Sequence, residues 1–368
     1  ALSPMRLSGV YISAYETDEW WAEYPPMEGR PGRVESLSLP RKALDCRILE
    51  EVRKAGVDVR EQHKVHDLIF QGGTVAGVKG WDADKTAFSF RAKVVVDAGG
   101  RNCVSIRRLN LRVLPKRSGK MAVSAHWEGV RLPRNYCYMH VSPPGYTGIA
   151  PVSGDRANVV LVVDSRRLKD QEVEDFYVKT VLQNRQRGAL LDGGNLTEKP
   201  RTVDSLAYSV KNLPCGGLLL VGDAMGFIDP FTGEGIYLSL RSAQMAAATI
   251  DSAFGKSDFS RRCLSEYEKA RMAEFHKKFL LSKILQKLIY NPSLCRGVVR
   301  TLAANPSLGK LLVGAIGDYW PAESVVSLKY LARLISGAIL PELKNPQENP
   351  RPTTQGTSNS NIAYRERH

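Results

Sequence analysis

Residues 218–247 have the types and the spacing of a site for a flat ligand that carries hydroxyl groups. The apolar run 218–221 predicts a buried strand, and Asp223 follows it almost directly. A carboxylate in this place can accept hydrogen bonds from a hydroxylated chain. A loop with proline and glycine then leads into a helix of small residues that is expected to reach Ala247. This order of strand, turn, loop and helix predicts a cradle for a cofactor.

Four residues at the start of that helix are candidates to lie against the ring of the ligand. The backbone N–H groups of Gly233, Glu234, Gly235 and Ile236 are expected to be free, because the first N–H groups of a helix have no partner within it. Such groups and the helix dipole present positive charge to an electron-rich ring. The two glycines allow a flat ligand to approach the backbone closely.

The sequence of residues 222–237 resembles the second flavin motif of the hydroxybenzoate-hydroxylase-like FAD superfamily, and it is most similar to the geranylgeranyl reductase branch. The resemblance implies that FAD is the cofactor and that Asp223 bonds its ribityl chain. It also implies that the helix start lies against the pyrimidine edge of the flavin, with Gly222 and Pro230 as further cofactor-binding residues. The plainer alternative is a buried strand, turn and helix whose aspartate caps the helix.

Residues 38–59 provide a second match, to the Arg-x-x-Phe-Asp-x-x-Leu helix of the same family and the Gly-Val-x-Val strand that follows it. The resemblance places Arg41 near the diphosphate and ribityl side of FAD. Leu44 stands where phenylalanine is usual. Taken alone, the segment is an amphipathic helix that ends at Gly56, with Arg41 as a surface charge.

Residues 92–108 are similar to a third motif of the superfamily, a strand followed by Asp-Gly. Gly99 stands where one form of the motif has aspartate, and Cys103 where it has serine. Because that aspartate is linked to contacts with FAD and nicotinamide, the external reductant stays open between NAD(P)H and a reduced carrier. A Gly-x-Gly-x-x-Gly turn, which would hold the ADP pyrophosphate, does not occur in the sequence. The expectation is therefore an N-terminally truncated domain that lacks its first βαβ unit.

The expected fold class is α/β, with a Rossmann-like FAD-binding domain, an antiparallel-sheet substrate domain and a helical C-terminal region. Short apolar runs between Met121 and Asp164, separated by proline and glycine, predict an antiparallel meander. The expected parts are a partial FAD-binding domain (1–110), the substrate domain (111–205), the second flavin motif of the FAD-binding domain (206–255), a helical region (256–343) and a disordered tail (344–368).

Five residues of the meander are candidates for a substrate cavity beside the flavin. Tyr146 and Pro151 agree with the Tyr-x-Trp-x-Phe-Pro wording of lipid-reducing relatives, whereas Gly148 and Ala150 replace large aromatic residues. This difference predicts a wider cavity and argues against a flavin halogenase. The remaining two candidates are His126 and His140, although a lone histidine on a strand is more often structural.

No side chain is identified as a catalytic acid, base or metal ligand. The six cysteines are scattered without zinc-site spacing and are expected to be reduced thiols, as in a soluble cytoplasmic enzyme. The net charge of +14 and the basic amphipathic segment 277–290 leave peripheral contact with the inner membrane surface open. The absence of a basic-aromatic platform argues against nucleic acid as a partner, and the sequence does not decide the oligomeric state.

The expected function is that of an FAD-dependent oxidoreductase that reduces C=C bonds of an apolar, isoprenoid-like small molecule by hydride transfer from flavin N5. The isoalloxazine supplies the electron chemistry in such enzymes, which fits the lack of an evident catalytic side chain. Three alternatives remain open from the sequence: an FAD-dependent monooxygenase, a quinone-linked dehydrogenase, and a non-catalytic remnant on a flavoprotein scaffold.

Overall fold

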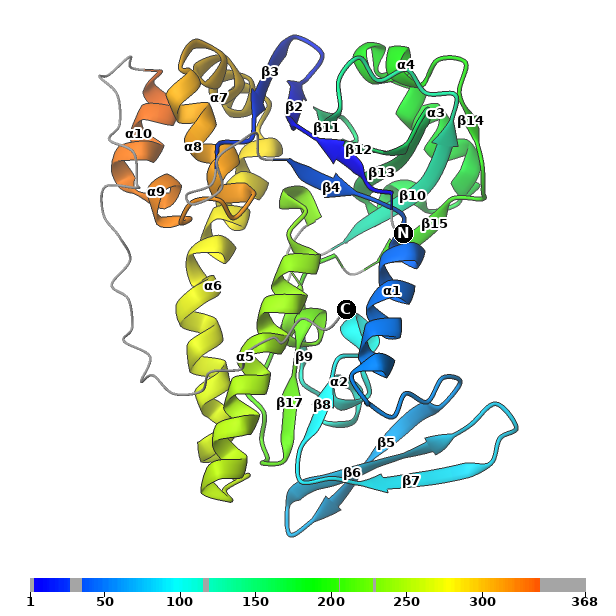
Figure 1. Cartoon of the computed structure of the whole chain (residues 1–368). Coiled ribbons are helices and arrows are strands. Elements are labelled where there is room, and N and C mark those ends of the chain that lie inside the picture. Colours follow the sequence, from blue (N-terminus) through cyan, green and yellow to red (C-terminus); the bar gives the residue numbers. More distant parts are fainter. Residues whose placement is uncertain (1–2, 27–34, 115–118, 205, 228–229, 338–368) are drawn as a thin grey trace, which may run out of the picture.

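The computed structural model describes residues 3–26, 35–114, 119–204, 206–227 and 230–337. Its described parts form two layers of structure that share one long helix, α6 (Arg261–Ile289) (Figure 1). One layer is a large sheet with helices on both faces. The other contains the flavin-motif strand and helix, with a small three-stranded sheet at its far end. The expected disordered tail at 344–368 lies outside the described residues.

The large sheet has eight strands and is mostly antiparallel. Its path runs through β14 (Asn195–Leu196), β10 (Lys120–Glu128), β13 (Arg156–Asp164), β12 (Gly145–Ser153), β11 (Tyr136–Ser142), β2 (Gly9–Ala14) and β3 (Asp18–Glu23), and β15 (Arg201–Asp204) also pairs with β10.

The expected meander is wrong in one respect. Strand β10 pairs with β13 rather than with β11, the next strand in the chain. Strand β11 instead pairs in parallel with β2, which comes from the start of the chain. The N-terminal hairpin of β2 and β3 therefore belongs to the sheet that was expected to begin at residue 111, and the expected boundary near residue 110 does not separate the two layers.

Successive side chains of a strand point to opposite faces, and in the central strands apolar residues occupy both sets of positions, so both faces of the sheet are buried. On β10, Ala122 packs into a core with the C-terminal helices, and the next residue, Val123, packs into a second core on the other face. That second core includes Tyr177 and Val181 of α3 (Val173–Gln183), which is followed by α4 (Arg185–Leu191). The sheet is thus held between α3 and α4 on one face and the C-terminal helices on the other (Figure 1).

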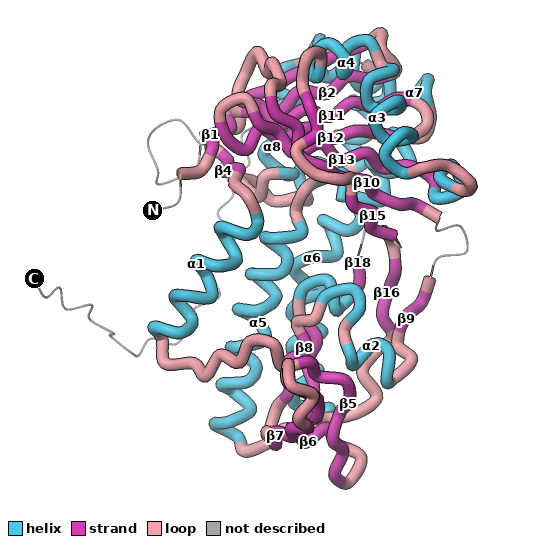
Figure 2. The backbone as a smooth tube through the Cα atoms, turned by 90° about the vertical axis from the view of Figure 1, so that its right-hand side faces the viewer, coloured by secondary structure: helices cyan, strands magenta, loops and turns pink. Residues whose placement is uncertain are grey.

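The flavin-motif segment folds as the sequence predicts, into strand, turn and helix. Strand β17 (Leu218–Leu220) pairs in parallel with β8 (Val95–Asp97), and a 3-10 turn follows at Gly222–Met225. Helix α5 (Gly235–Lys256) then runs beside α6 (Figure 2). It continues past the motif, which reaches Ala247, and ends at Lys256.

Helix α1 (Arg41–Lys54) forms where the second motif predicts it and ends before Gly56, which has a positive φ of 82°. None of its residues is buried by the part of the chain that the structure describes. The strand expected over 56–59 is not formed: Val57 is exposed, and the next strand begins at Lys64.

One pair of small strands, β1 (Met5–Leu7) with β4 (Ser36–Ser38), contacts β12 of the large sheet. The remaining small elements complete the second layer. They are β5 (Lys64–Gln71) with β6 (Thr74–Trp81) and β7 (Ala87–Arg91), β9 (Arg112–Val113) with β16 (Tyr208–Val210) and β18 (Gly226–Phe227), and helix α2 (Val104–Arg108).

The C-terminal region is helical, as expected. After α6 come α7 (Pro292–Ala304), α8 (Pro306–Ile316), α9 (Glu323–Val326) and α10 (Leu328–Ser336). Asn291 caps α7 through a 3.0 Å hydrogen bond from the N–H of Leu294. Asn305 precedes α8, but its side-chain amide donates back to the carbonyl of Thr301, so the second expected side-chain cap is not made.

Candidate active site

The turn after β17 is shaped by Gly222. Its φ is +59°, and a Cβ at this position would lie 2.8 Å from the Oγ of Ser239 on α5. Glycine is therefore required both for the left-handed backbone and for the close approach of the helix. The N–H of Gly222 donates to the Oγ of Ser242, which fixes the turn on α5. The next residue, Asp223, is held at this junction of strand and helix.

The carboxylate of Asp223 lies in a basic environment to which two elements each contribute one arginine. Burial raises the pKa of Asp223, and the guanidinium groups of Arg101 and Arg41 act in the opposite direction. Arg41 also pairs with Asp45, one turn further along α1. The structure thus brings Arg41 and Asp223 into electrostatic range, as the two motifs predicted. Arg101 was missed, although it stands within the third motif; its other contact is a 2.7 Å hydrogen bond to the carbonyl of Asp204.

The third motif is held by its own aspartate. Asp97 accepts hydrogen bonds from the N–H groups of Gly99 and Ser105, at 3.0 and 2.9 Å. A Cβ on Gly99 would lie 3.0 Å from Asp97 Oδ1 and 3.1 Å from the Cβ of Cys103. The aspartate that some relatives carry at this position would therefore need the turn to shift.

Beside the start of α5 the backbone is open. A Cβ on Gly233 or Gly235 would meet no atom of the described chain within 4 Å. Gly233 has a φ of +73°, which accounts for glycine at this position. The N–H of Gly233 was expected to be free. It donates instead to the carbonyl of Pro230 at 3.0 Å. Among the described residues no side chain caps α5, so its first turn faces this open space without a side-chain partner.

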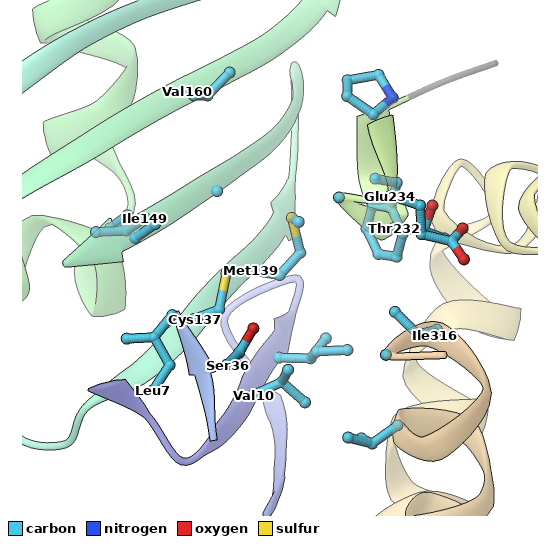
Figure 3. A pocket seen from close by; sticks show the side chains of 18 of the residues that line it. Leu7, Val10, Ser36, Cys137, Met139, Ile149, Val160, Thr232, Glu234 and Ile316 are labelled. Carbon is cyan, nitrogen blue, oxygen red and sulfur yellow. The ribbon is translucent and has the colours of Figure 1, made fainter. Parts of the chain in front are cut away.

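A cavity of about 460 Å³ lies between this segment and the large sheet. In Figure 3, Val10 and Met139 from the sheet side face Thr232, Glu234 and Ile316 across it. The lining is mainly apolar and includes Leu7, Ile12, Trp20, Cys137, Tyr146, Val160, Val162, Phe231 and Val313. Its size falls within the range of pockets that hold small molecules.

Of the five residues expected in a substrate cavity, Tyr146 and Gly148 line this one. His140, expected there, is instead on the opposite face of the sheet, where its Nδ1 lies 2.7 Å from the Oγ of Ser13 and burial lowers its pKa to about 3. Side chains alternate along β11, so Cys137 and Met139 face the cavity and His140 cannot.

The other two expected residues are also outside the cavity lining. His126 lies on β10, away from the lining residues, and its Nδ1 is 2.7 Å from a carboxylate oxygen of Glu198. Pro151 pairs with Ala157 in the sheet and is not one of the residues that line the cavity. The wider cavity expected at Gly148 is consistent with a Cβ there meeting only the Cε of Met139, at 3.7 Å.

One end of the cavity is ionic, and the sequence patterns did not reveal it. The ammonium group of Lys278 on α6 contacts the carboxylates of both Glu234 and Asp318. The side chains of Lys278 and Glu234 are only 10% and 7% exposed. Glu234 and Asp318 line the cavity, and Tyr237 completes this end with its ring 5.1 Å from Lys278 Nζ. The only sequence signal was a lysine in register with the apolar face of the basic helix.

The basic helix expected at 277–290 is part of α6 and packs on its own molecule. Leu281, Leu285 and Leu288 are buried in the core beneath the sheet, while Leu280 is exposed. Within the described ranges, no helix combines the length and the apolar character needed to cross a bilayer. No group of three or more metal-ligating side chains is found in the same part of the chain, and its six cysteines are free thiols.

These residues fit FAD. A carboxylate at the end of a buried strand can accept hydrogen bonds from ribityl hydroxyls, and the open glycines at an uncapped helix start leave room for a flat ring. The arginines beside Asp223 suit the anionic diphosphate side.

Comparison with known proteins also indicates FAD as the cofactor. The FAD binding domain family model matches residues 29–277, which is more than half of the chain. Digeranylgeranylglycerophospholipid reductase 1 of Methanococcoides burtonii is 27% identical over 261 residues, which cover 69% of this chain and 62% of that protein. The chain thus spans about 62% of the length of this relative.

Solved structures share the fold. A geranylgeranyl bacteriochlorophyll reductase-like protein of Thermoplasma acidophilum is 23% identical, with a TM-score of 0.70 over 90% of this chain and 83% of that chain. The flavin-dependent brominase Bmp2 is 18% identical, with a TM-score of 0.74 over 88% of this chain and 80% of that chain. The motif, the cradle and the family match agree, and the chain belongs to the FAD binding domain family, with FAD as the family's cofactor.

Proposed function

We propose that the protein reduces C=C bonds of an apolar, isoprenoid-like molecule with FAD as its redox cofactor. One observation carries this proposal: the flavin-motif segment and an apolar wall of the sheet face each other across a single cavity. Pro230, Gly233 and Glu234 line one side, and Val10, Met139 and Val160 line the other. A ligand in this cavity would be covered by apolar side chains on the sheet side and would lie next to the open start of α5.

In this proposal the residues of the chain bind and orient FAD and the apolar ligand. Asp223 would hold the ribityl hydroxyls, and the first turn of α5 would direct its N–H groups at the ring. When bound, FAD supplies the hydride chemistry that no side chain can supply. Trp20, Tyr146 and Ile316 on the cavity wall would exclude water from the ligand.

Two further parts of the proposal concern the substrate and its source. The relative from M. burtonii is named as a reductase of digeranylgeranylglycerophospholipid, and an apolar lining suits a ligand with isoprenoid chains. Such a molecule would reach the protein from a membrane surface, which the net charge of +14 favours when the lipids are anionic. The electron donor would be NAD(P)H or a reduced carrier.

The test is to reconstitute the protein with FAD and to follow both the flavin and the lipid substrate during the reaction. We expect a flavin absorption spectrum, bleaching by a two-electron donor, and reoxidation under nitrogen on addition of a geranylgeranyl lipid. Mass spectrometry of that lipid should show a gain of two hydrogen atoms for each C=C bond reduced. Reoxidation that requires oxygen and inserts it into the product would establish a monooxygenase, and a halogenated product would establish a halogenase. Failure to bind flavin would refute the proposal as a whole.

A further inference from the structure

The ionic end of the cavity contains more acidic than basic side chains. Lys278 contributes one positive charge, and Glu234 and Asp318 contribute two negative charges when both are ionised. A third carboxylate nearby, Glu274, forms its own pair with Arg241 at 2.6 Å, so this arginine does not neutralise the excess negative charge. A buried group of charges with a net charge is costly, and uptake of a proton by one carboxyl removes that cost.

Helix dipoles decide which of the two carboxyls takes the proton. Glu234 is the N-cap residue of α5, where the positive end of the helix stabilises a carboxylate. Asp318 directly follows Gly317, the C-cap residue of α8, where the negative end of a helix disfavours a carboxylate. The two helix ends therefore favour an ionised Glu234 and a protonated Asp318.

Burial and the neighbouring carboxylates also favour the protonated form of Asp318. Burial raises the pKa of Asp318 to about 6, although Lys278 acts to lower it, and the charges of Glu234 and Glu274 add to the increase. Asp318 has a φ of +62°, a left-handed conformation that aspartate and asparagine adopt more readily than most other residues.

Asp318 also has access to a ligand. It lines the cavity together with Glu234 and Tyr237, whereas Lys278 is not among the lining residues. Opposite this ionic end, the cavity is bounded by the apolar residues of the sheet. We propose that Asp318 is the proton donor of this cavity and that Lys278 and Glu234 are positioning residues that hold its proton in place.

This inference rests on the reductase function proposed above, because reduction of a C=C bond needs one proton in addition to a hydride. The hydride equivalent comes from reduced flavin, which a two-electron donor regenerates, and is added to one carbon. At the other carbon a C–H bond forms while the O–H bond of Asp318 breaks. The carboxylate that remains is paired with Lys278 and regains its proton from water before the next turnover.

The first test detects the proton on the carboxyl group by infrared spectroscopy and does not require catalytic turnover. The infrared band of a protonated carboxylic acid should be present in the full chain below pH 6 and should disappear as the pH rises through about 6. In Asp318→Asn this band should be missing. In Glu234→Gln it should remain but titrate at a lower pH than in wild type, because the charge of Glu234 helps to raise the pKa of Asp318. Asparagine tolerates the left-handed backbone of residue 318, which preserves the fold. A matched control is Asp170→Asn, because Asp170 is exposed and has a similar φ of +63°.

Loss of the band in Glu234→Gln but not in Asp318→Asn would assign the proton to Glu234 and overturn the proposal. A wild-type chain without a band that titrates in this range would also overturn it, whether or not any variant folds. These outcomes do not depend on flavin or on the substrate, so they separate this inference from the reductase function.

The second test uses the FAD-loaded protein and a C=C substrate that it reduces. Asp318→Asn should lower kcat/KM by about a hundredfold or more, the usual contribution of a general acid, while the affinity for FAD stays within about twofold of wild type. The wild-type reaction should slow as the pH rises through about 6, and the variant should lose this dependence. A variant with the wild-type rate and pH profile would exclude Asp318 as the donor. Absence of C=C reduction in wild type would refute the reductase function alone.

Discussion

Asp18 on β3 accepts hydrogen bonds from Arg300 on α7, which joins the N-terminal hairpin to the C-terminal helices. Arg296, one turn earlier on α7, donates to the same carboxylate at 3.0 Å. The side chain of Asp18 is only 10% exposed. These bonds connect residues that are almost 300 positions apart in the chain, and they lie beside the core that closes the cavity.

Replacing Asp18 by asparagine should therefore destabilise the protein in a pH-dependent way. The hydrogen bonds from Arg300 hold the pKa of Asp18 at about 2, below its usual value of 3.8. A lowered pKa stabilises the fold above the usual value, and this stabilisation is lost as the pH falls from about 4 to about 2. Asp18→Asn should lose roughly 1–2 kcal/mol near neutral pH in urea unfolding, and less in acid. Asp192→Asn, at an exposed position, is the control and should match wild type.

Replacing Asp223 by alanine should weaken FAD binding without unfolding the protein. The change removes an acceptor for charge-assisted hydrogen bonds worth roughly 1.5–3 kcal/mol, or about ten- to a hundredfold in Kd. Titration of flavin fluorescence would measure the effect. Asp251→Ala, at an exposed position on α5, should leave Kd unchanged. Equal affinities in both variants would remove Asp223 from the cofactor site.

Leucine at position 235 should block the flavin cradle while the fold remains intact. Gly235 has open space on its Cβ side, and helices favour leucine over glycine by nearly 1 kcal/mol. We expect Gly235→Leu to keep or raise Tm and to lose FAD binding. Gly255→Leu tests the same change at the other end of α5, where the Cβ also meets open space. If Gly235→Leu binds FAD normally, the flavin does not lie against this turn.

Filling the cavity from the sheet side should affect the substrate and not the cofactor. Gly148 has room for a side chain, because a Cβ at this position would have only the Cε of Met139 within 4 Å. Gly148→Phe should raise KM for a bulky apolar substrate by about tenfold or more and should leave the Kd of FAD within about twofold. The measurement is steady-state kinetics with substrates of increasing chain length. An unchanged KM for the longest substrate would place its binding site elsewhere.

The local structure of the flavin motif could be predicted from sequence because its residues are close together in the chain. Strand β17, the turn after it and the start of α5 follow one another closely, and their geometry depends on local glycines, so the motif alone predicted the place of Asp223 and of the open turn. Arg41 comes from a separate motif, and its position near Asp223 required the family resemblance.

The substrate side could not be predicted in the same way. The direction of His140 depends on which residues of β11 face the cavity, and a shift of one residue reverses the direction of every side chain. The ionic end joins Glu234, Lys278 and Asp318 from three elements, so no local pattern connects them. Similarly, the parallel pairing of β2 with β11 joins segments more than 100 residues apart, which left the N-terminal hairpin unassigned to the sheet.

The walls of the cavity extend from Leu7 and Val10 near one end of the described chain to Ile316 and Asp318 near the other. Contacts over such separations carry a large entropy cost of loop closure and tend to form late in folding. A partly folded chain can therefore contain the flavin turn while the cavity is still open. Binding of an apolar fluorescent probe in the cavity would then report the completion of folding, later than any signal from α5 or β17.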